Sequence, residues 1–304
     1  MKVVTLLPSA TEIVCALGRE GDLVGVSHSC EFPASVRELP RMTSTHVPYT
    51  ESSDVIDAYV RDHLSGHEAL YDLDVAELEK AAPDVVVSQA LCDVCAVATG
   101  DVKGAVCGLP SGPELVDLEP NTLGEVLDDI VRVGAALGAD AEAMQVVDSL
   151  KARRDAVANR TATIPQAERP RVLFLEWLIP PFNGGHWNPE LVELAGGIDL
   201  LGAKGQPSST QDWDGIVESR PDVIFIACCG FDSQRTLEDV EQISKTDAWQ
   251  GLPAARDGLV YIADGDYFSC PGPRLLDGLE ILAHALHPDV HPAPAVGAAR
   301  VFNG

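Results

Sequence analysis

The sequence predicts an α/β protein of two lobes, each a parallel sheet with flanking helices, joined by a single long helix. A helix tail, a Pro-Asp pair, an apolar strand and a cysteine occur in this order twice, in residues 77–92 and in residues 215–229. A second matching pair, residues 11–27 and 189–203, reads in each case as a helix that ends at glycine and leads to a strand. Between the copies, about forty residues from Asn121 onward have helical periodicity. A duplicated α/β unit implies two similar lobes with a cleft where a small molecule could bind.

The N-terminal lobe is predicted over residues 1–118. It begins with the strand KVVTLL, which leads through Pro8 and Ser9 into a helix. Ser9 with Glu12 three residues later fits a capping box, so Ser9 is the predicted N-cap. The run after Pro83 is apolar throughout, as expected of a parallel strand covered on both faces. Residues 31–72, rich in Pro, Ser, Thr and His, interrupt the pattern with one short helical stretch.

The remaining domains follow from the same patterns. Residues 119–168 form the helical connector, in which a Gly-containing pause separates two amphipathic stretches. The C-terminal lobe spans residues 169–290 and starts with the strand RVLFLEWL, while the Pro- and Gly-rich tail 291–304 is predicted to be loose.

Composition excludes several classes of function. A chain of 304 residues, 46% hydrophobic, can form two cores. Its net charge of −26 argues against nucleic-acid binding by a broad basic surface, and no apolar stretch reaches the roughly 20 residues that span a bilayer. The first residues read as a strand and its turn, which leaves no cleavable signal peptide. We therefore expect a cytoplasmic monomer that does not insert into membranes.

Eight cysteines are many for such a chain, and in a reducing compartment each is a core residue, a ligand or a reactive thiol. Cys15 lies on the apolar face of the first helix and is expected in the core. Ligand crevices in α/β sheets lie outside the carboxyl ends of the strands, so thiols that follow strands are expected to line the cleft together with His28 and His186. The cysteines in such positions are Cys30, Cys92, Cys95, Cys228, Cys229 and Cys270.

The chemistry of these thiols stays open at this point. Cys92-x-x-Cys95 has a spacing that suits a structural role, contact with a metal or a corrinoid, or dithiol redox chemistry. His28 and Cys30 could supply nitrogen and sulfur ligands, or a cap and core packing. Cys228 and its neighbour Cys229 would point to opposite faces of a strand, so at most one reaches the cleft. The candidate metal ligands are His28, Cys30, Cys92, Cys95 and Cys270.

Aromatic residues indicate the character of the ligand. Trp177 and Phe182 flank a Pro-Pro turn after a core strand, Trp187 follows in a Gly-rich stretch, and Tyr267 precedes Cys270 in a loop. Such surfaces would hold a planar, largely apolar macrocycle, although Trp177 and Trp187 could instead cover the core of the lobe. Glu176 is unusual in its strand because a buried ionisable group is costly unless it is paired or functional.

Motifs of common enzyme classes are missing. The sequence has no G-x-G-x-x-G after its first strand, no phosphate loop, no G-x-S-x-G and no H-E-x-x-H. The turn at Pro8 and Ser9 can still offer backbone N–H groups to an anionic or carbonyl-bearing ligand. We predict a binding protein and not an enzyme.

Five segments carry a family resemblance: LLPSATEIVCALG, LVGVS, AAPDVVV, LEWLIPPFNGG and DYFSCPGPRLLDGLEIL. Over residues 2–287 the chain resembles the class III, helical-backbone substrate-binding proteins of ABC transporters, most of all the cobalamin-binding family of vitamin uptake systems. The resemblance implies two Rossmann-like lobes that clamp a corrinoid, haem-type or siderophore ligand with little hinge motion and no catalytic turnover. It implies no cofactor besides that ligand. Members of the family are usually periplasmic or lipid-anchored.

The resemblance also implies docking to a permease. Each lobe of the family presents an acidic residue about seven positions before its Pro-Asp pair. In the C-terminal lobe that residue is Asp214, whereas the N-terminal position is Ala76, so the adjacent Glu77 is the predicted substitute, with Asp74 also nearby.

We therefore predict a protein that binds a cobalamin-like corrinoid or metal chelate in its inter-lobe cleft, as a substrate-binding protein of an ABC transporter. The alternatives are a cytosolic thiol-rich metallochaperone, a corrinoid-handling enzyme that uses the cleft cysteines, or a receptor that ligates a transition metal directly. The predicted ligand-binding residues are Pro8, Ser9, His28, Cys30, Cys92, Cys95, Trp177, Phe182, Trp187, Cys228, Tyr267 and Cys270.

Overall fold

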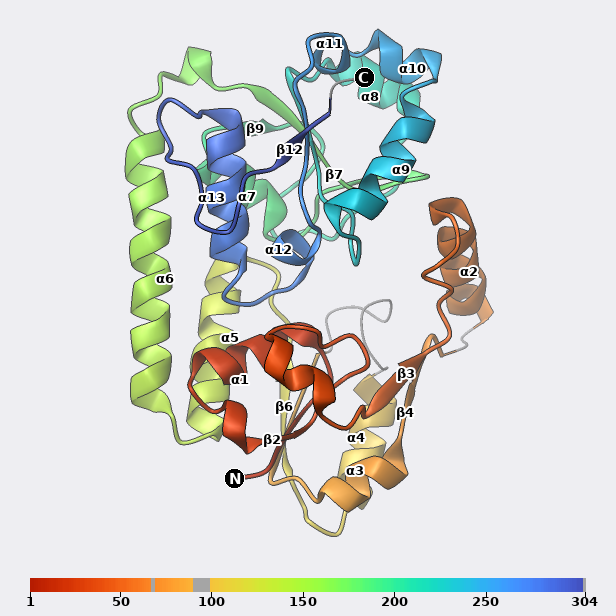
Figure 1. Cartoon of the computed structure of the whole chain (residues 1–304), viewed down its shortest axis with the longest axis vertical. Coiled ribbons are helices and arrows are strands. Elements are labelled where there is room, and N and C mark those ends of the chain that lie inside the picture. Colours follow the sequence, from red (N-terminus) through yellow and green to blue (C-terminus); the bar gives the residue numbers. More distant parts are fainter. Residues whose placement is uncertain (67–68, 90–98, 303–304) are drawn as a thin grey trace. The chain divides into compact units, whose positions relative to one another are not determined.

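The computed structural model describes residues 1–66, 69–89 and 99–302. The chain forms two α/β units, of which unit 1 comprises residues 1–120 and 124–149, and unit 2 comprises residues 121–123 and 150–304. Each unit has its own sheet and its own helices (Figure 1). The predicted fold class is confirmed.

Unit 1 is built on a four-stranded parallel sheet with strand order β2-β1-β5-β6. Every residue of its central strand β5 is buried, as expected for a parallel strand covered on both faces. The strands are β1 (Val3–Thr5), β2 (Leu23–Gly25), β5 (Val85–Gln89) and β6 (Glu114–Leu118). The helices are α1 (Pro8–Ala16), α3 (Val75–Ala81), α4 (Thr99–Gly108) and α5 (Leu123–Ala136).

Unit 2 contains a larger, mixed sheet with strand order β12-β11-β10-β7-β8, and β9 pairs with β7. Its centre is parallel, and the outer strands β8 and β12 are antiparallel. The strands are β7 (Arg171–Leu178), β8 (Pro181–Asn183), β9 (Ile198–Asp199), β10 (Val223–Ile226), β11 (Val260–Ile262) and β12 (Arg300–Val301). The helices are α7 (Asn188–Leu194), α8 (Trp213–Ser219), α9 (Ser233–Ile243), α10 (Asp247–Gly251), α11 (Pro253–Arg256), α12 (Asp266–Ser269) and α13 (Leu275–Leu286).

The sequence repeat has the same hydrogen bonds in both units. In unit 1 the Asp84 carboxylate accepts the backbone N–H of Lys2 at 2.7 Å, next to β1. In unit 2 the Asp222 carboxylate accepts the N–H of Arg171 at 2.8 Å, at the start of β7. Each Pro-Asp pair therefore ends a helix and also aligns the start of a neighbouring strand.

The first helix begins two residues earlier than the capping box predicts. Pro8 occupies the first turn, Leu7 is the N-cap, and the cap has no side-chain hydrogen bond. Pro is well suited to this position because its fixed φ matches the helix and its missing N–H needs no partner there. Ser9 thus lies inside α1 and is not its cap.

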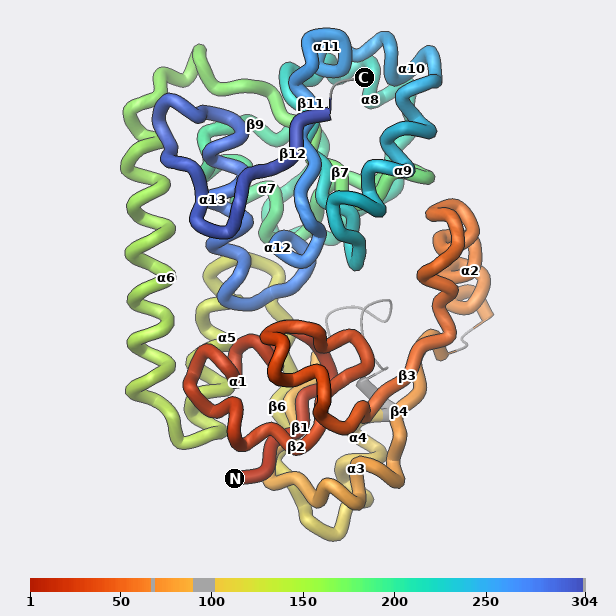
Figure 2. The backbone as a smooth tube through the Cα atoms, viewed as in Figure 1, coloured from red at the N-terminus to blue at the C-terminus, as the bar shows by residue number. Residues whose placement is uncertain are grey.

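The interruption at residues 31–72 forms an excursion from unit 1. It contains the two-stranded antiparallel sheet of β3 (Thr43–Thr45) and β4 (Tyr71–Leu73), with α2 (Ser53–Gly66) between the two strands. In the tube drawing, β3 and β4 run side by side and α2 lies at the far end of the excursion (Figure 2). The excursion begins at the carboxyl end of β2, where Met42 N–H donates to the carbonyl oxygen of Val26.

The helical connector consists of two helices. After α5 the chain turns at Gly138, whose φ of 60° favours glycine, and continues as α6 (Asp140–Thr161). A side chain at Gly134 of α5 would overlap Ala143 of α6, so the two helices meet closely there. The boundary between the two units falls inside α6, after Ser149.

The tail is more ordered than its composition predicts. Residues 300–301 form β12, which pairs with β11, and the N–H of Phe302 donates to the carbonyl oxygen of Val260. The edge of β11 offers backbone groups that need partners, and the tail supplies them. The prediction of a loose tail is wrong at these residues.

Candidate functional site

The loops at the carboxyl ends of the parallel strands carry most of the predicted ligand residues. In unit 1, Pro8 and Ser9 follow β1. The Ser9 hydroxyl is buried and has no hydrogen-bond partner among the described residues. Pro8 is half-buried at the start of α1, so it is the more accessible residue of this turn.

Cys30 follows β2 but points into the core. Its Sγ atom lies 3.0 Å from Thr11 Oγ1 and 3.1 Å from Ser27 Oγ, and the residue has no exposed surface. Burial raises the pKa of the thiol, which therefore stays protonated near neutral pH. Arg41 donates to the carbonyl oxygens of Ser27 and Cys30 and holds the loop in this form. These contacts favour a packing role for Cys30.

His28 is the more accessible of this pair. Its ring stacks on Tyr71 with centroids 5.4 Å apart, and Nδ1 lies 2.8 Å from Thr43 Oγ1. Burial, assisted by the nearby Arg41 charge, lowers the pKa of His28, so its imidazole is neutral near pH 7. His28 thus joins β2 to the β3–β4 excursion.

The metal-site prediction finds no support in the described part of the chain. Cys92 and Cys95 lie outside the described residues. Among the residues that the structure does describe, no group of three or more His, Cys, Asp or Glu is placed to hold a metal ion. Ligation by His28, Cys30, Cys92, Cys95 and Cys270 stays a prediction.

In unit 2, two of the three predicted aromatic residues lie side by side. Trp177 and Phe182 are partners across the antiparallel β7–β8 pair, and both are only half-buried. The Trp177 ring packs on Phe231 with centroids 4.9 Å apart, and its Nε1 donates to the carbonyl oxygen of Ile179 at 3.1 Å. Phe231, which sequence reasoning missed, follows β10, so the strand-end rule could have found it. Together they form an aromatic surface that is fixed in orientation.

Trp187 occupies a different environment. It is 3% exposed, and its Nε1 donates to the carbonyl oxygen of Phe268 at 2.8 Å. The indole therefore ties the start of α7 to α12 inside unit 2. In this structure it presents almost no surface to a ligand.

The unit 2 cysteines also differ from one another. Cys228 is buried, and burial raises its pKa, whereas the adjacent Cys229 is half-buried. Cys270 is half-buried and follows directly after α12, the short helix that contains Tyr267. The Arg274 guanidinium lies 5.4 Å from the centroid of the Tyr267 ring, a cation–π contact.

The Glu176 carboxyl group accepts several hydrogen bonds at this edge. Its Oε2 accepts the N–H of Gly185 at 3.0 Å and Nδ2 of Asn188 at 3.3 Å, and the Ser208 hydroxyl also hydrogen-bonds to the carboxyl group. Burial raises the pKa of Glu176, and these hydrogen bonds oppose the rise. The costly charge that the sequence indicated is thus paired with donors.

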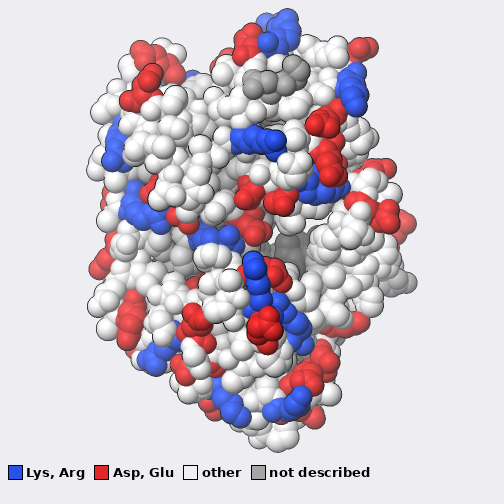
Figure 3. Space-filling model, viewed as in Figure 1, with Lys and Arg blue, Asp and Glu red and all other residues white. Residues whose placement is uncertain are grey.

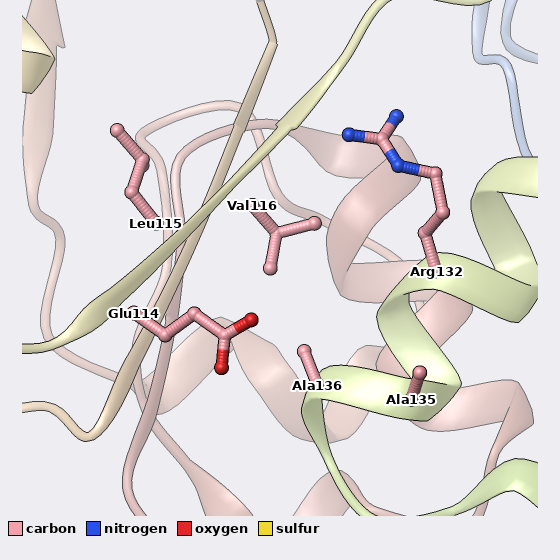
Figure 4. A pocket seen from close by; sticks show the side chains of 6 residues that line it. All are labelled: Glu114, Leu115, Val116, Arg132, Ala135 and Ala136. Carbon is pink, nitrogen blue, oxygen red and sulfur yellow. The ribbon is translucent and has the colours of Figure 1, made fainter.

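A hollow of about 380 Å³ lies elsewhere in unit 1, between β6 and α5 (Figure 4). Its lining residues are Glu114, Leu115, Val116, Arg132, Ala135 and Ala136. Arg132 is already engaged, because it pairs with Asp129 at 2.7 Å and donates to the carbonyl oxygen of Asp117 at 2.6 Å. The hollow follows the edge of the sheet, and no predicted ligand residue lines it.

The predicted docking residues lie on equivalent helices. Asp214 is exposed in the first turn of α8, where Asp212 is the N-cap. Glu77 lies in the first turn of α3, where Asp74 is the N-cap, and it pairs with Lys80 at 3.1 Å. Both carboxylates are therefore at helix N-termini, where negative charge is favourable.

A family model described as periplasmic binding protein matches residues 3–267 of the chain. The chain belongs to the periplasmic binding protein family. The predicted resemblance to helical-backbone substrate-binding proteins is confirmed, and so is the prediction of a binding protein rather than an enzyme.

Individual relatives agree with the family. The chain is 24% identical to the ABC transporter substrate-binding lipoprotein YvrC of Bacillus subtilis, over 95% of this chain and 80% of that protein. It is 22% identical to the vitamin B12-binding protein of Vibrio cholerae, over 92% of this chain and 86% of that protein.

Two solved structures share the fold. The periplasmic vitamin B12-binding protein of Vibrio cholerae superposes with a TM-score of 0.69 at 19% identity, over 94% of this chain and 96% of that one. The apo periplasmic heme-binding protein RhuT of Roseiflexus sp. RS-1 superposes with a TM-score of 0.72 at 19% identity, over 95% of this chain and 98% of that one.

These findings correct the predicted location. The relatives are a lipoprotein and periplasmic proteins, which contradicts a cytoplasmic location and points to one outside the cytoplasm. The prediction rested on the first residues reading as β1, and a strand carries no information about the compartment. Within the described residues, no helix has the length and apolar character needed to cross a membrane.

Proposed function

We propose that this periplasmic binding protein is the substrate-binding component of an ABC importer and that its ligand is a metal tetrapyrrole, with a cobalamin-like corrinoid as the first candidate. The family match and the substrate-binding relative support the transport role. The structural relatives named for vitamin B12 and for heme support the ligand class, because both ligands are large macrocycles that carry a metal.

The observation that carries the ligand proposal is the aromatic pair Trp177 and Phe182. Their half-buried rings lie in register on β7 and β8, and Phe231 supports one of them. Burial of apolar macrocycle surface against such rings would supply most of the affinity. Pro8, His28, Tyr267 and Cys270 are the other accessible candidates for contact.

Thiol chemistry is the weaker alternative. Cys30 and Cys228 are buried, and their raised pKa values disfavour the thiolate that ligation or redox exchange requires. Cys30 and Cys228 are therefore not among the proposed ligand contacts. Ser9 and Trp187 are not among them either, because both residues are buried. Cys92 and Cys95 keep their predicted role as an open proposal.

Calorimetric titration tests the ligand class. Cyanocobalamin, cobinamide and hemin are titrated separately, with tryptophan fluorescence as a second signal. Binding of cyanocobalamin and cobinamide but not hemin would support a corrinoid, and the reverse result would assign a heme ligand. If none of the three produces heat or quenching at high micromolar concentration, the tetrapyrrole proposal is wrong.

A further inference from the structure

The carboxylate of Glu176 connects strand β7 to two loops of unit 2. It accepts hydrogen bonds from Gly185 in the loop after β8, from Asn188 at the start of α7, where that loop ends, and from the hydroxyl of Ser208 in a second loop. A side chain at Gly185 would overlap the backbone of Ser208, so the two loops are in direct contact. Glu176 therefore contacts the point where they meet.

Between those contacts the backbone is strained. His186 has a φ of 53°, in the left-handed region that non-glycine residues rarely adopt. Its N–H donates to the carbonyl oxygen of Gln206 at 2.6 Å, and its carbonyl oxygen accepts the N–H of Gly205 at 2.8 Å. Such a conformation persists only where the surroundings over-determine it, and strain of this kind is concentrated at binding sites.

The strained loop is continuous with the aromatic surface. Phe182 lies in β8, and the loop begins directly after that strand. Trp177, its partner on β7, is the residue next to Glu176. A displacement of the loop would therefore shift one ring of the pair relative to the other.

We propose that Glu176 is a positioning residue of the ligand site: its carboxylate holds the strained loop around His186 and so keeps Phe182 in register with Trp177. The inference rests on the proposed function, because it treats the aromatic pair as ligand-binding. Its central claim about the loop, however, can be measured without any ligand.

The ionisation of Glu176 should then control the loop. Protonation removes negative charge from the acceptor of Gly185 and Asn188, and because burial raises the pKa of Glu176, this occurs at a higher pH than for an ordinary carboxyl group. The neighbouring titratable groups are uncharged near neutral pH, since burial raises the pKa of Cys228 and lowers that of His186. The buried Asp239, which pairs with Arg235 at 3.1 Å, is the remaining carboxylate near Cys228.

The first measurement is hydrogen exchange of the ligand-free protein. In Glu176→Gln, the amides of residues 183–188 should exchange at least about tenfold faster than in the wild type. Asp129→Asn is the matched control, because Asp129 is a buried carboxylate of unit 1 whose burial raises its pKa to about 6. It should leave exchange at 183–188 unchanged. Unchanged exchange in Glu176→Gln would overturn the proposal, whether or not any ligand binds.

The second measurement is binding of cyanocobalamin and hemin between pH 5 and pH 8. For the probe that binds, Glu176→Gln should weaken affinity about tenfold at pH 8. The wild-type affinity should fall as the pH falls, whereas that of the variant should change little. If exchange accelerates but affinity and pH profile match the wild type, the loop does not serve ligand binding and the proposal is wrong. If the wild type binds neither probe, the proposed function fails, and the exchange result alone decides whether Glu176 holds the loop.

Discussion

Two aromatic side chains held in register across the β7–β8 pair are the residues on which ligand affinity should depend most. Trp177 is fixed by Phe231 on one side and by its own Nε1 hydrogen bond to Ile179. A side chain that is already ordered loses little conformational entropy when a ligand covers it. Trp187 is buried, so a ligand cannot cover its ring, and its effect on ligand affinity should be indirect.

Trp177→Ala should weaken binding of the proposed tetrapyrrole ligand by about 1–3 kcal/mol, the scale of one well-buried aromatic contact. Calorimetric titration measures the change. Trp213→Ala is the control, since Trp213 lies in α8 and packs edge-on against Trp249. Equal losses in the two variants would contradict a specific contact at Trp177.

His291 is a buried neutral imidazole that should make folding sensitive to acid. It is 2% exposed, Nε2 lies 3.2 Å from Thr161 Oγ1, and Nδ1 has no hydrogen-bond partner among the described residues. Burial, with nearby His287, Arg160 and His284, lowers the pKa of His291 to about 4. In the unfolded chain the pKa is about 6.5, so the unfolded chain takes up the proton first.

The stabilisation from neutral His291 is therefore complete above about pH 6.5 and is lost as the pH falls toward about 4. Over that range the wild type should lose about 2 kcal/mol more of its free energy of unfolding than His291→Gln. Urea unfolding at several pH values gives the free energy of unfolding as a function of pH for the wild type and for the variant. Parallel curves would show that His291 does not titrate as its burial requires.

At the scale of elements, the turn between α5 and α6 depends on a close approach of two helices. Gly134 has no room for a side chain because Ala143 lies against it. Gly104 of α4 is also helical, but a side chain there would meet nothing within 4 Å. The two glycines therefore make a matched pair.

Gly134→Leu should lower the free energy of unfolding by about 1–3 kcal/mol, because the added side chain forces α5 and α6 apart. Gly104→Leu should be neutral or slightly stabilising, since leucine has the higher helix propensity. The midpoints of urea unfolding of the two variants and the wild type measure these changes in stability. A Gly134 variant as stable as the wild type would mean that the helices separate without cost.

For the whole molecule, net charge and its distribution bear on partners. The net charge is −26, and on the face drawn in Figure 3 acidic and basic side chains are interspersed. Among the residues coloured there, the basic side chains form no broad continuous surface on this face. The predicted docking residues Asp214 and Glu77 lie in the first turns of α8 and α3.

Asp214→Lys should sharply reduce ligand uptake in cells that carry the cognate permease, while the affinity of the purified protein for ligand stays unchanged. Glu77→Lys should act in the same way through unit 1. Glu218→Lys is the control because it reverses an exposed charge on the same helix α8. Uptake equal to that of the control would remove both residues from the docking surface.

The sequence by itself determined the duplicated architecture. Pro83 and Pro221 with the aspartates that follow them specify local events, the end of a helix and the start of a strand, and such signals need only neighbouring residues. The resemblance of five segments then led to the family, which the family match confirms. The aromatic pair was also within reach, since both rings flank one Pro-Pro turn.

Only the tertiary structure decided which of the strand-end side chains face outward. Cys30 and Trp187 both follow strands, where ligand-binding side chains were expected. The Cys30 thiol instead contacts the hydroxyls of Thr11 and Ser27, and the Trp187 indole N–H donates to the carbonyl oxygen of Phe268. Ser27 is a near neighbour of Cys30, but Thr11 and Phe268 are distant in the chain from the side chains that they contact, so no local pattern reveals those two contacts. The direction of a side chain depends on the packing and hydrogen bonds that distant residues offer, whereas the order of helices and strands is largely encoded by neighbours.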